Sequence, residues 1–590
     1  MTKSVFIVSS LFKEKLQDKK CVVLDNYIAV NNPELNCGEL HACPRNSKND
    51  WLRYEKKVVD KHSKYSAILT ERLNKLHNIN YSDRYWQQLF YLGIKRYIAL
   101  VYEFFNQVES RFDHENHDFR LLDKESFYTP FDLEDLRSYL SYSEHAYEQL
   151  FSIYIEQFYS ELISDDLKIM NIGVYKPKTK KQKHSFIKRA IYSIYDKLKI
   201  FNPTVILLGV QYSPSKIKKL LLKSKSKIFL YVLAPFERPE VKLNNIDVDK
   251  RDGLSVYNEN FDKFDKFFFK TLESFFPIIF IEDYSDASKY YDYQAKLFPK
   301  VKYIISESWI SSSSMMFFIA HQQKMHGTKF ISTEHKGVAH TYENNLLEDM
   351  VNISDLYFTI GWYHKDFDAN LKLVKTGLMS PAKAKIDNLE EYKNKILYLT
   401  APAYAKRTNY FGNNFFTGED SKYFFDFQKS FFSELDTQVL NNIIYRSAPI
   451  MRTLKIATYN HLDILKKYIK YMQIDSGKYS GPDAMLSSKL VVINYIGTGY
   501  IESIINNIPT IIFLNKNMYL TSYGEEMYSE LIDQEIIQSD PKKAAHFLMR
   551  VEKEPEKWWY SEEVQKARKS FLSKVVGDSC VLEKTILELM

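Results

Sequence analysis

The amino-acid sequence predicts an α/β protein with two unequal, doubly wound domains that face a cleft, and with a helical insertion in the first domain. Short apolar runs rich in β-branched residues alternate with longer amphipathic stretches, which is typical of βα units around parallel sheets. A charged segment, residues 381–394, interrupts this rhythm and is interpreted as a linker. No internal repeat occurs at the periods of solenoid proteins. We therefore expect a first α/β domain over residues 1–380, a second α/β domain over 395–540, and helices over 541–590.

The first domain is expected to begin with two short strands, at residues 5–9 and 21–24. Apolar residues near helical spacing then predict the insertion over about residues 48–165. A helix is also expected over residues 312–326, with Gly327 at its end. Further apolar runs predict the remaining strands of this half, at residues 204–210, 227–233, 277–282, 302–306, 329–333, 355–361 and 372–377.

The second domain repeats the pattern with four buried-strand signals separated by helical stretches. These runs lie at residues 395–400, 442–445, 490–495 and 510–514. In open α/β sheets of this kind, ligands bind outside the carboxyl ends of the strands. Polar residues that follow these strands are therefore the first candidates for a functional site.

Composition excludes two classes of protein. Hydrophobic residues make up 45% of the 590 residues, which is enough for packed cores and excludes a globally disordered chain. The net charge of +7 is too small for a polycation that coats nucleic acid. Four cysteines suit a reducing compartment, and neither a signal peptide nor a membrane-spanning run is evident, so we expect a cytoplasmic protein.

Two lysine-rich stretches, residues 176–189 and 213–227, stand out from the rest of the chain. They are interpreted either as solvated loops and helix faces or as a peripheral contact with the inner face of an anionic membrane. Nucleic acid is not an expected partner, because no nucleic-acid-binding module accompanies the charge.

The most informative segment of the second domain follows the run at residues 490–495. Gly497, Thr498 and Gly499 predict a tight turn into a helix, whose free N–H groups and dipole form a prepared site for an anion. Glycines let the backbone approach a phosphate closely, and Glu502, one turn further on, can reach a ribose hydroxyl. Asn494, at the end of the strand, is grouped with these donor-binding candidates. An ordinary strand, turn and helix remains the alternative.

A second candidate segment closes the first domain. Glu334, His335 and Lys336 follow a predicted strand directly, at the edge where ligands bind. A carboxylate beside an imidazole can transfer a proton, and the lysine can neutralise an anion. The alternative is a surface turn. Two other histidines nearby, His321 and His326, are expected on an exposed helix face.

Cationic side chains follow two strands of the second domain. Arg446 comes after the run at 442–445 and is a candidate clamp for a carboxylate or phosphate. Lys406 lies in the loop after the domain's first strand, where it either contacts the donor or is simply solvated. No site for a metal ion is evident, so metal-independent chemistry is expected.

These segments together resemble the GT-B glycosyltransferases and, more narrowly, a bacterial family of O-antigen-locus transferases. The shared motifs are an Arg-Tyr-Trp helix, a Ser-x-Ser-Trp stretch that includes Ser308, a Gly-x-Lys turn, a Gln-His-Gly-like turn and a Tyr-Arg stretch. They lie at residues 84–93, 306–309, 327–329, 333–337 and 445–449. Glu334 stands where the family usually has Gln, and Lys336 where it usually has Gly. That family is similar to retaining pseudaminyltransferases and to capsule Kdo transferases.

The resemblance implies transfer of an acidic sugar, a nonulosonic acid such as pseudaminic acid or Kdo, from a CMP-activated donor. The acceptor would be a hydroxyl of a bacterial surface glycan or a lipid-linked glycan, with no cofactor. Glu334 or His335 would manage the acceptor proton, with Lys336, Ser308 and Lys406 as substrate-binding candidates. The helix opened by Thr498 and Gly499 would hold the leaving phosphate, with Glu502 on the ribose and Arg446 on an anionic donor group. A UDP- or GDP-sugar transferase and a non-catalytic polyanion-binding scaffold remain alternatives.

Overall fold

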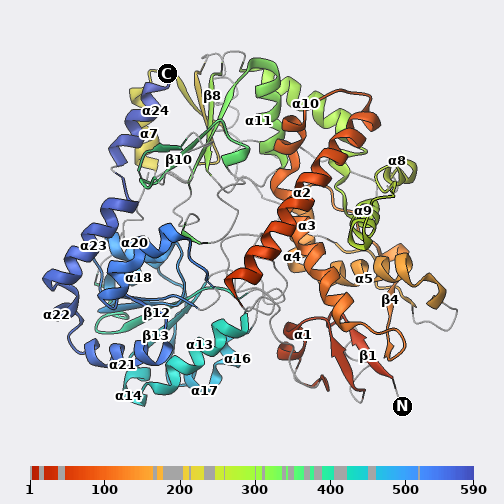
Figure 1. The fold of residues 1–590 in the computed structure, drawn as a ribbon. Coiled ribbons are helices and arrows are strands. Elements are labelled where there is room, and N and C mark those ends of the chain that lie inside the picture. Colours follow the sequence, from red (N-terminus) through yellow and green to blue (C-terminus); the bar gives the residue numbers. More distant parts are fainter. Residues whose placement is uncertain are drawn as a thin grey trace.

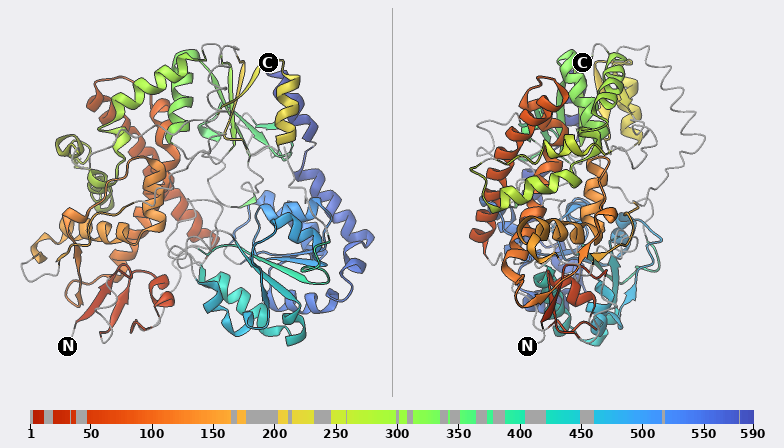
Figure 2. Two further views of the ribbon diagram at one scale, coloured as in Figure 1. Left: turned by 180° about the vertical axis from the view of Figure 1, so that it is seen from behind. Right: turned by 90° about the vertical axis from the view of Figure 1, so that its right-hand side faces the viewer.

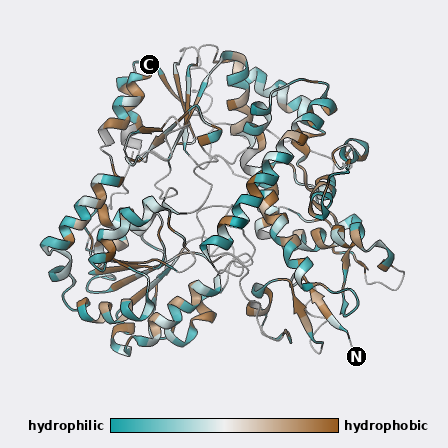
Figure 3. Ribbon diagram, in the orientation of Figure 1, coloured by the Kyte–Doolittle hydropathy of each residue, from teal (hydrophilic) through white to brown (hydrophobic). Residues whose placement is uncertain are grey.

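Two parallel six-stranded sheets form the centres of two α/β domains in the computed structural model (Figure 1). The structure describes residues 3–11, 19–32, 34–37, 47–163, 169–176, 203–210, 214–231, 246–257, 259–298, 301–307, 313–334, 341–342, 351–363, 373–377, 388–403, 421–448, 460–515, 518–577 and 579–590. The strands of both sheets are the most apolar parts of the ribbon, whereas the surrounding helices are polar on one side (Figure 3). This arrangement confirms the predicted GT-B-like class of two doubly wound domains.

The first sheet has the strand order β11-β10-β9-β8-β6-β7, and all its pairs are parallel. Its strands are β6 (Val205–Leu208), β7 (Ile228–Tyr231), β8 (Tyr303–Glu307), β9 (Lys329–Thr333), β10 (Leu356–Thr359) and β11 (Leu373–Lys375). Helices α10 (Tyr284–Lys296) and α11 (Ser313–His326) lie on one side of it, and α7 (Pro214–Lys223) on the other (Figure 1). Because both faces are covered, the strands are apolar runs without alternation.

The second sheet has the order β14-β13-β12-β15-β16-β17 and is also parallel throughout. Its strands are β12 (Ile396–Thr400), β13 (Ile443–Ser447), β14 (Gln473–Ile474), β15 (Leu490–Ile493), β16 (Thr510–Phe513) and β17 (Ile537–Gln538). The four predicted strands are its centre. The two edge strands were not predicted, because two residues are too few to show a period.

The N-terminal strands do not join the first large sheet, which differs from the expectation of one domain with an insertion. β1 (Ser4–Ile7) is the central strand of a separate small sheet and pairs in parallel with β2 (Cys21–Val23) on one side and β3 (His117–Asp118) on the other. Helices α2 (Lys48–His77), α3 (Asp83–Arg111), α4 (Leu133–Tyr142) and α5 (His145–Phe158) fill the predicted helical region. The small sheet lies at one end of the molecule, far from β8 in every view (Figures 1 and 2).

The prediction of a strand at residues 277–282 is wrong. Residues Ile278–Phe280 form a 3-10 helix, and all three side chains are buried. Pro277 precedes it with φ −65°, and the segment joins α9 (Lys263–Phe275) to α10, with the Ile278 and Ile279 N–H groups donating to the Pro130 and Phe131 carbonyl oxygens at 3.0 and 2.9 Å. A short, fully buried apolar run does not distinguish a strand from a buried turn by its period, and here the packing decided.

The histidines of α11 are not exposed, which corrects a second expectation. The imidazole of His321 is fully buried between Asp292, 2.7 Å from Nδ1, and the hydroxyl of Tyr85, 3.1 Å from Nε2. Burial lowers the pKa of His321, although Asp292 opposes the shift. His326 is half-buried, with Nε2 3.2 Å from the Ala295 carbonyl oxygen. α11 contacts both α10 and α3, so it has little free surface.

The C-terminal helices return the chain to the first domain. α21 (Pro541–Val551), α22 (Pro555–Trp559) and α23 (Glu562–Val575) cover the second domain, and α24 (Ser579–Glu588) packs against α7 (Figure 1). Glu583 of α24 pairs with Lys219 at 3.1 Å and Lys223 at 2.6 Å, so two lysines of the second basic stretch are neutralised within the protein. A β-bridge between Gly361, which follows β10, and Val576, which follows α23, lies where the chain passes back to the first domain.

Candidate active site

The two domains touch beside the carboxyl ends of their central strands. The Tyr342 hydroxyl donates to the Ile496 carbonyl oxygen at 3.1 Å, and the Thr521 N–H donates to the Thr341 carbonyl oxygen at 3.0 Å. Gly524 is required here, because a Cβ would lie 2.2 Å from the Thr341 oxygen. Residues 341–342 of the first domain therefore fit closely against the loop before α19 (Thr498–Ile505) and the start of α20 (Ser522–Asp533).

Glu334 directly follows β9 near this contact and is buried, with 8% of its surface exposed. Its Oε2 accepts the Ile360 N–H at 3.2 Å and the indole N–H of Trp362 at 2.5 Å. Its own N–H donates to the Phe358 carbonyl oxygen at 2.8 Å. The carboxylate is therefore held in place by the residues that follow the neighbouring strand β10.

The charge of Glu334 reaches side chains of the second domain. Burial, followed by the Glu334 charge, raises the pKa of Tyr523 in α20 to about 12. Burial raises the pKa of Tyr500 in α19 well above its usual range, and Glu334 contributes to that shift. The end of β9 and helix α19 are therefore electrostatic neighbours across the domain boundary.

Helix α19 begins without a side-chain cap. Gly497 is its extended N-cap residue, and no side chain accepts a hydrogen bond from the first turn at that position. A Cβ on Gly497 would lie 2.4 Å from the Tyr495 ring, so the protein itself requires this glycine. A Cβ on Gly499 would meet nothing closer than 3.9 Å. Of these two glycines, therefore, only Gly499 is one whose lack of a side chain could serve the close approach of a ligand.

Asn494 ties together the carboxyl ends of three strands. Its Nδ2 donates to the Thr400 hydroxyl at 2.8 Å, and its Oδ1 accepts the Ala401 N–H at 3.1 Å. Its carbonyl oxygen accepts the side-chain amide of Asn515 at 2.9 Å. Asn494 is buried, with 1% of its surface exposed. Its hydrogen bonds hold the strand ends together, and the predicted role of Asn494 in binding the donor stays a prediction.

The family model of the LIC12162 family transferases matches residues 5–584. The chain belongs to this family. It is therefore an enzyme of a transferase family. No curated protein matches the sequence.

Solved structures similar to this LIC12162 family transferase include several glycosyltransferases. Trehalose-6-phosphate synthase OtsA is 11% identical with a TM-score of 0.36, and the match covers 65% of this chain and 98% of that chain. The glycotransferase of kitacinnamycin is 10% identical over the same shares, with a TM-score of 0.34. Anabaena Alr3699/HepE in complex with UDP and glucose is 9% identical over the same shares, with a TM-score of 0.34.

Arg446 does not lie free at the sheet edge of this transferase. Its Nη1 lies 2.5 Å from Asp475 Oδ2, and its Nη2 donates to the Tyr479 carbonyl oxygen at 2.8 Å. The side chains of both partners of the ion pair are buried, at 9% and 0% exposed. The predicted donor clamp is therefore engaged in a structural ion pair between β13 and the segment after β14.

Glu502 points back towards the turn that opens α19. It is buried, with 8% exposed, and its charge adds to the burial that raises the pKa of Tyr495 to about 12. Tyr495 is the residue whose ring packs under Gly497. The role of Glu502 in binding a ribose hydroxyl stays a prediction.

Several predicted residues fall outside the described parts of the chain. They are His335, Lys336, Ser308 and Lys406, together with the side chain of Thr498, residues 381–387 of the linker and residues 177–189 of the first basic stretch. Within the described residues, no three His, Cys, Asp or Glu side chains are grouped so that they could hold a metal ion. No helix in the described ranges combines the length and apolar character needed to cross a lipid bilayer.

The sequence did not point to Trp362 or Tyr523 as site residues. Trp362 follows β10 in the chain, so the rule that ligands gather at carboxyl ends could have found it. Tyr523 begins a helix far along the chain and carries no motif. His461 is fully buried under the loop that follows β12, and its Nε2 accepts the Ala403 N–H at 3.4 Å. Burial lowers the pKa of His461 to about 3.

Proposed function

We propose that this transferase is a glycosyltransferase that moves an acidic sugar from a CMP-activated donor to a hydroxyl of a surface glycan. The observation that carries the proposal is that residues 341–342 of the first domain contact the loop before α19, while burial and the charge of Glu334, just after β9, raise the pKa of Tyr500 in α19. It supports a site shared by the two sheets, with an anion-binding helix on one side and the Glu334–His335 pair on the other. Donors of the nonulosonic acid or Kdo type are what the resemblance to the O-antigen-locus transferases implies.

The donor side of the proposal rests on α19. Its N-terminal N–H groups have no side-chain cap at Gly497, and the dipole of the helix favours a negative charge there. In our proposal this end of the helix holds the phosphate of CMP, and Gly499 lets the phosphate approach the backbone. Glu502 would bind the ribose.

The acceptor side needs a group that receives a proton. In the proposed step, the acceptor oxygen forms a bond to the anomeric carbon, and the bond from that carbon to the CMP phosphate oxygen breaks with its electron pair. The acceptor proton passes to a base. The Glu334 carboxylate already accepts two N–H groups, so we assign it to positioning and His335, the next residue, to the proton. We propose that the reaction needs no metal ion.

Thermal-shift titration with CMP, UDP and GDP tests the donor class. A nucleotide at 100 times its Kd adds about 2.7 kcal/mol of stability, which is readily measured. Stabilisation by CMP alone supports the proposal, and product analysis with CMP-activated acidic sugars then identifies the sugar. Stabilisation by UDP or GDP alone would instead support a transferase for a neutral sugar. Binding of polyanions with a steep salt dependence and no nucleotide preference would support the scaffold alternative.

A further inference from the structure

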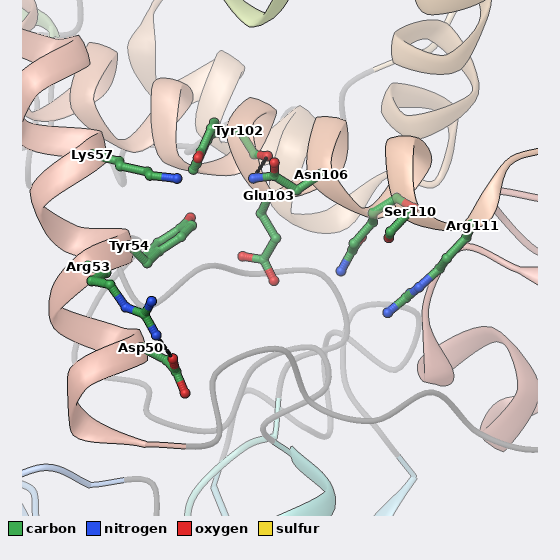
Figure 4. Close-up of a pocket in the computed structure, with 10 residues that line it drawn as sticks. Asp50, Arg53, Tyr54, Lys57, Tyr102, Glu103, Asn106, Ser110 and Arg111 are labelled. Carbon is green, nitrogen blue, oxygen red and sulfur yellow. Dashed lines mark hydrogen bonds and ion pairs between the residues drawn. The ribbon is translucent and has the colours of Figure 1, made fainter.

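A cavity of about 320 Å³ lies between helices α2 and α3, in the N-terminal part that no motif assigned to a function (Figure 4). This volume lies at the lower end of the range of about 300–1,000 Å³ that is usual for small-molecule pockets. The lining residues that matter for its chemistry are Tyr54, Lys57, Tyr102, Glu103, Asn106 and Arg111. The cavity is therefore large enough for one or two sugar rings.

One wall of the pocket is aromatic and rigid. The rings of Tyr54 and Tyr102 lie 5.7 Å apart, and Tyr102 packs edge-on against Phe264 at 4.9 Å. The Tyr54 hydroxyl donates to the Ala99 carbonyl oxygen at 2.9 Å, which fixes α2 to α3. Both rings are only half-buried, so they retain surface for a ligand without having to move.

The polar side chains of the pocket combine both charges and both hydrogen-bonding roles. Lys57 extends from α2 and Glu103 from α3 into the space between the helices (Figure 4). Asn106, one turn after Glu103, adds an exposed amide, whose Nδ2 donates to the Tyr102 carbonyl oxygen at 2.8 Å. Arg53, at the rim, is already paired with Asp50.

This mixture fits sugar hydroxyls better than a phosphate group. A hydroxyl both donates and accepts, so it can bind an ammonium, an amide and a carboxylate together. Two of the three cations in the lining are engaged, because Arg53 pairs with Asp50 and Arg111 donates to the Leu24 carbonyl oxygen. A phosphate attracted by Lys57 would be repelled by Glu103, and a nucleotide is accounted for elsewhere in our proposal. The aromatic rings complement the apolar faces of sugar rings.

The pocket lies next to the contact between the domains. Lys48, at the first position of α2, donates to the Leu520 carbonyl oxygen at 2.7 Å and lies 3.8 Å from the Glu525 carboxylate of α20. α20 also carries Tyr523, whose pKa responds to Glu334. The pocket lining begins at Asp50, two residues after Lys48. A glycan that occupies the pocket is thus beside the helix that borders the candidate active site.

We propose that the pocket between α2 and α3 binds a saccharide unit of the acceptor glycan. The assignment of this saccharide to the acceptor rests on the proposed function. Saccharide binding itself can be tested without any transfer. Figure 4 shows the side chains that would make the contacts, from two helices of the N-terminal part rather than from either large sheet.

Saturation-transfer NMR on the full chain, without nucleotide, tests the binding directly. The probes are lactose, N-acetyllactosamine and sialyllactose, and the variants are Lys57→Ala and Glu103→Gln. Lys56→Ala is the matched control, because Lys56 is the exposed neighbour of Lys57 on α2 and does not line the cavity. We expect saturation transfer to at least one probe, a loss in both pocket variants, and no change in the control. No transfer to any probe, or equal transfer in all variants, overturns the inference.

A kinetic measurement separates this inference from the proposed function. With a working donor and acceptor, Lys57→Ala should raise the acceptor KM about tenfold, the effect of one lost charged hydrogen bond. The donor KM and donor hydrolysis without acceptor should not change. An unchanged acceptor KM with normal transfer overturns the pocket assignment alone. If the protein binds a saccharide, loses this binding in Lys57→Ala, and binds no nucleotide, the proposed function is overturned and the pocket assignment stands.

Discussion

Trp362 donates its indole N–H to the carboxylate of Glu334 and so fixes the residue that follows β9 against the residues that follow β10. Trp362 is fully buried, and the Ile360 N–H binds the same oxygen at 3.2 Å. Two neighbouring parallel strands thus position one carboxylate at the domain contact. The arrangement makes the carboxylate dependent on a residue 28 positions later in the chain.

Trp362→Phe should lower both stability and turnover. The substitution keeps an aromatic ring but leaves a buried carboxylate oxygen without one of its donors, which costs about 1–3 kcal/mol. Urea unfolding and kcat measure the two effects. Trp559→Phe is the control, because it removes a similarly buried indole donor, here to Asn507, which follows the end of α19 opposite to the turn at Gly497. Equal turnover in both variants would contradict the role of Trp362 in positioning Glu334.

His335→Ala should lower kcat by about 10²–10⁴-fold with little effect on donor affinity, the usual contribution of a general base. Glu334→Gln should have a smaller effect on kcat, because the amide oxygen can still accept the Trp362 and Ile360 N–H groups. Steady-state kinetics and CMP titration check both. If Glu334→Gln proved the more damaging variant, the assigned roles of the two residues would have to be exchanged.

The two glycines that open α19 should respond differently to alanine. Gly497→Ala forces a methyl group to 2.4 Å from the Tyr495 ring and should destabilise the protein by about 1–3 kcal/mol. Gly499→Ala meets no atom within 3.8 Å and should preserve or slightly raise the melting temperature, because alanine favours a helix. Its donor KM should nevertheless rise. Normal donor affinity in Gly499→Ala would show that the phosphate does not approach this turn.

Arg446→Met should unfold the protein at lower denaturant rather than weaken donor binding. Removing one partner leaves Asp475 as a buried, uncompensated charge, at a cost of about 3–5 kcal/mol. Arg446→Met combined with Asp475→Leu should recover most of that loss, since neither charge then remains. Loss of CMP affinity in the folded double variant would restore the donor-clamp hypothesis for Arg446.

Stability should fall on acidification, in part because of buried histidines. Burial lowers the pKa of both His461 and His62 to about 3 in the folded protein, against 6.5 in an unfolded chain. Each contribution is complete above pH 6.5 and is lost as the pH falls towards 3, by about 2 kcal/mol between pH 6.5 and 5. His461→Gln should reduce this loss in denaturant unfolding at the two pH values. Exposed His546→Gln is the control, and identical slopes would contradict the prediction.

The candidate site was only partly readable from the sequence. Glu334 was predicted because polar residues after buried strands mark a sheet edge, and Gly497 because it opens a helix directly after such a strand. Asn494 and Arg446 satisfied the same rule, yet their polar atoms bind Thr400, Ala401 and Asp475 inside the second domain. Sequence position gives the edge of the sheet but not the partners that a side chain meets there.

The sequence alone determined the order of apolar runs and hence two parallel sheets, because strands covered on both faces must be apolar throughout. It also determined the helical N-terminal region and the unusual turn before α19. Only the tertiary structure decided that the 278–280 run is a 3-10 helix, that β1 and β2 form a sheet of their own, and that α24 returns to the first domain. These depend on contacts between residues far apart in the chain, which a local pattern does not encode. The same reason explains why the closeness of Glu334 to Tyr523 became evident only in the folded protein.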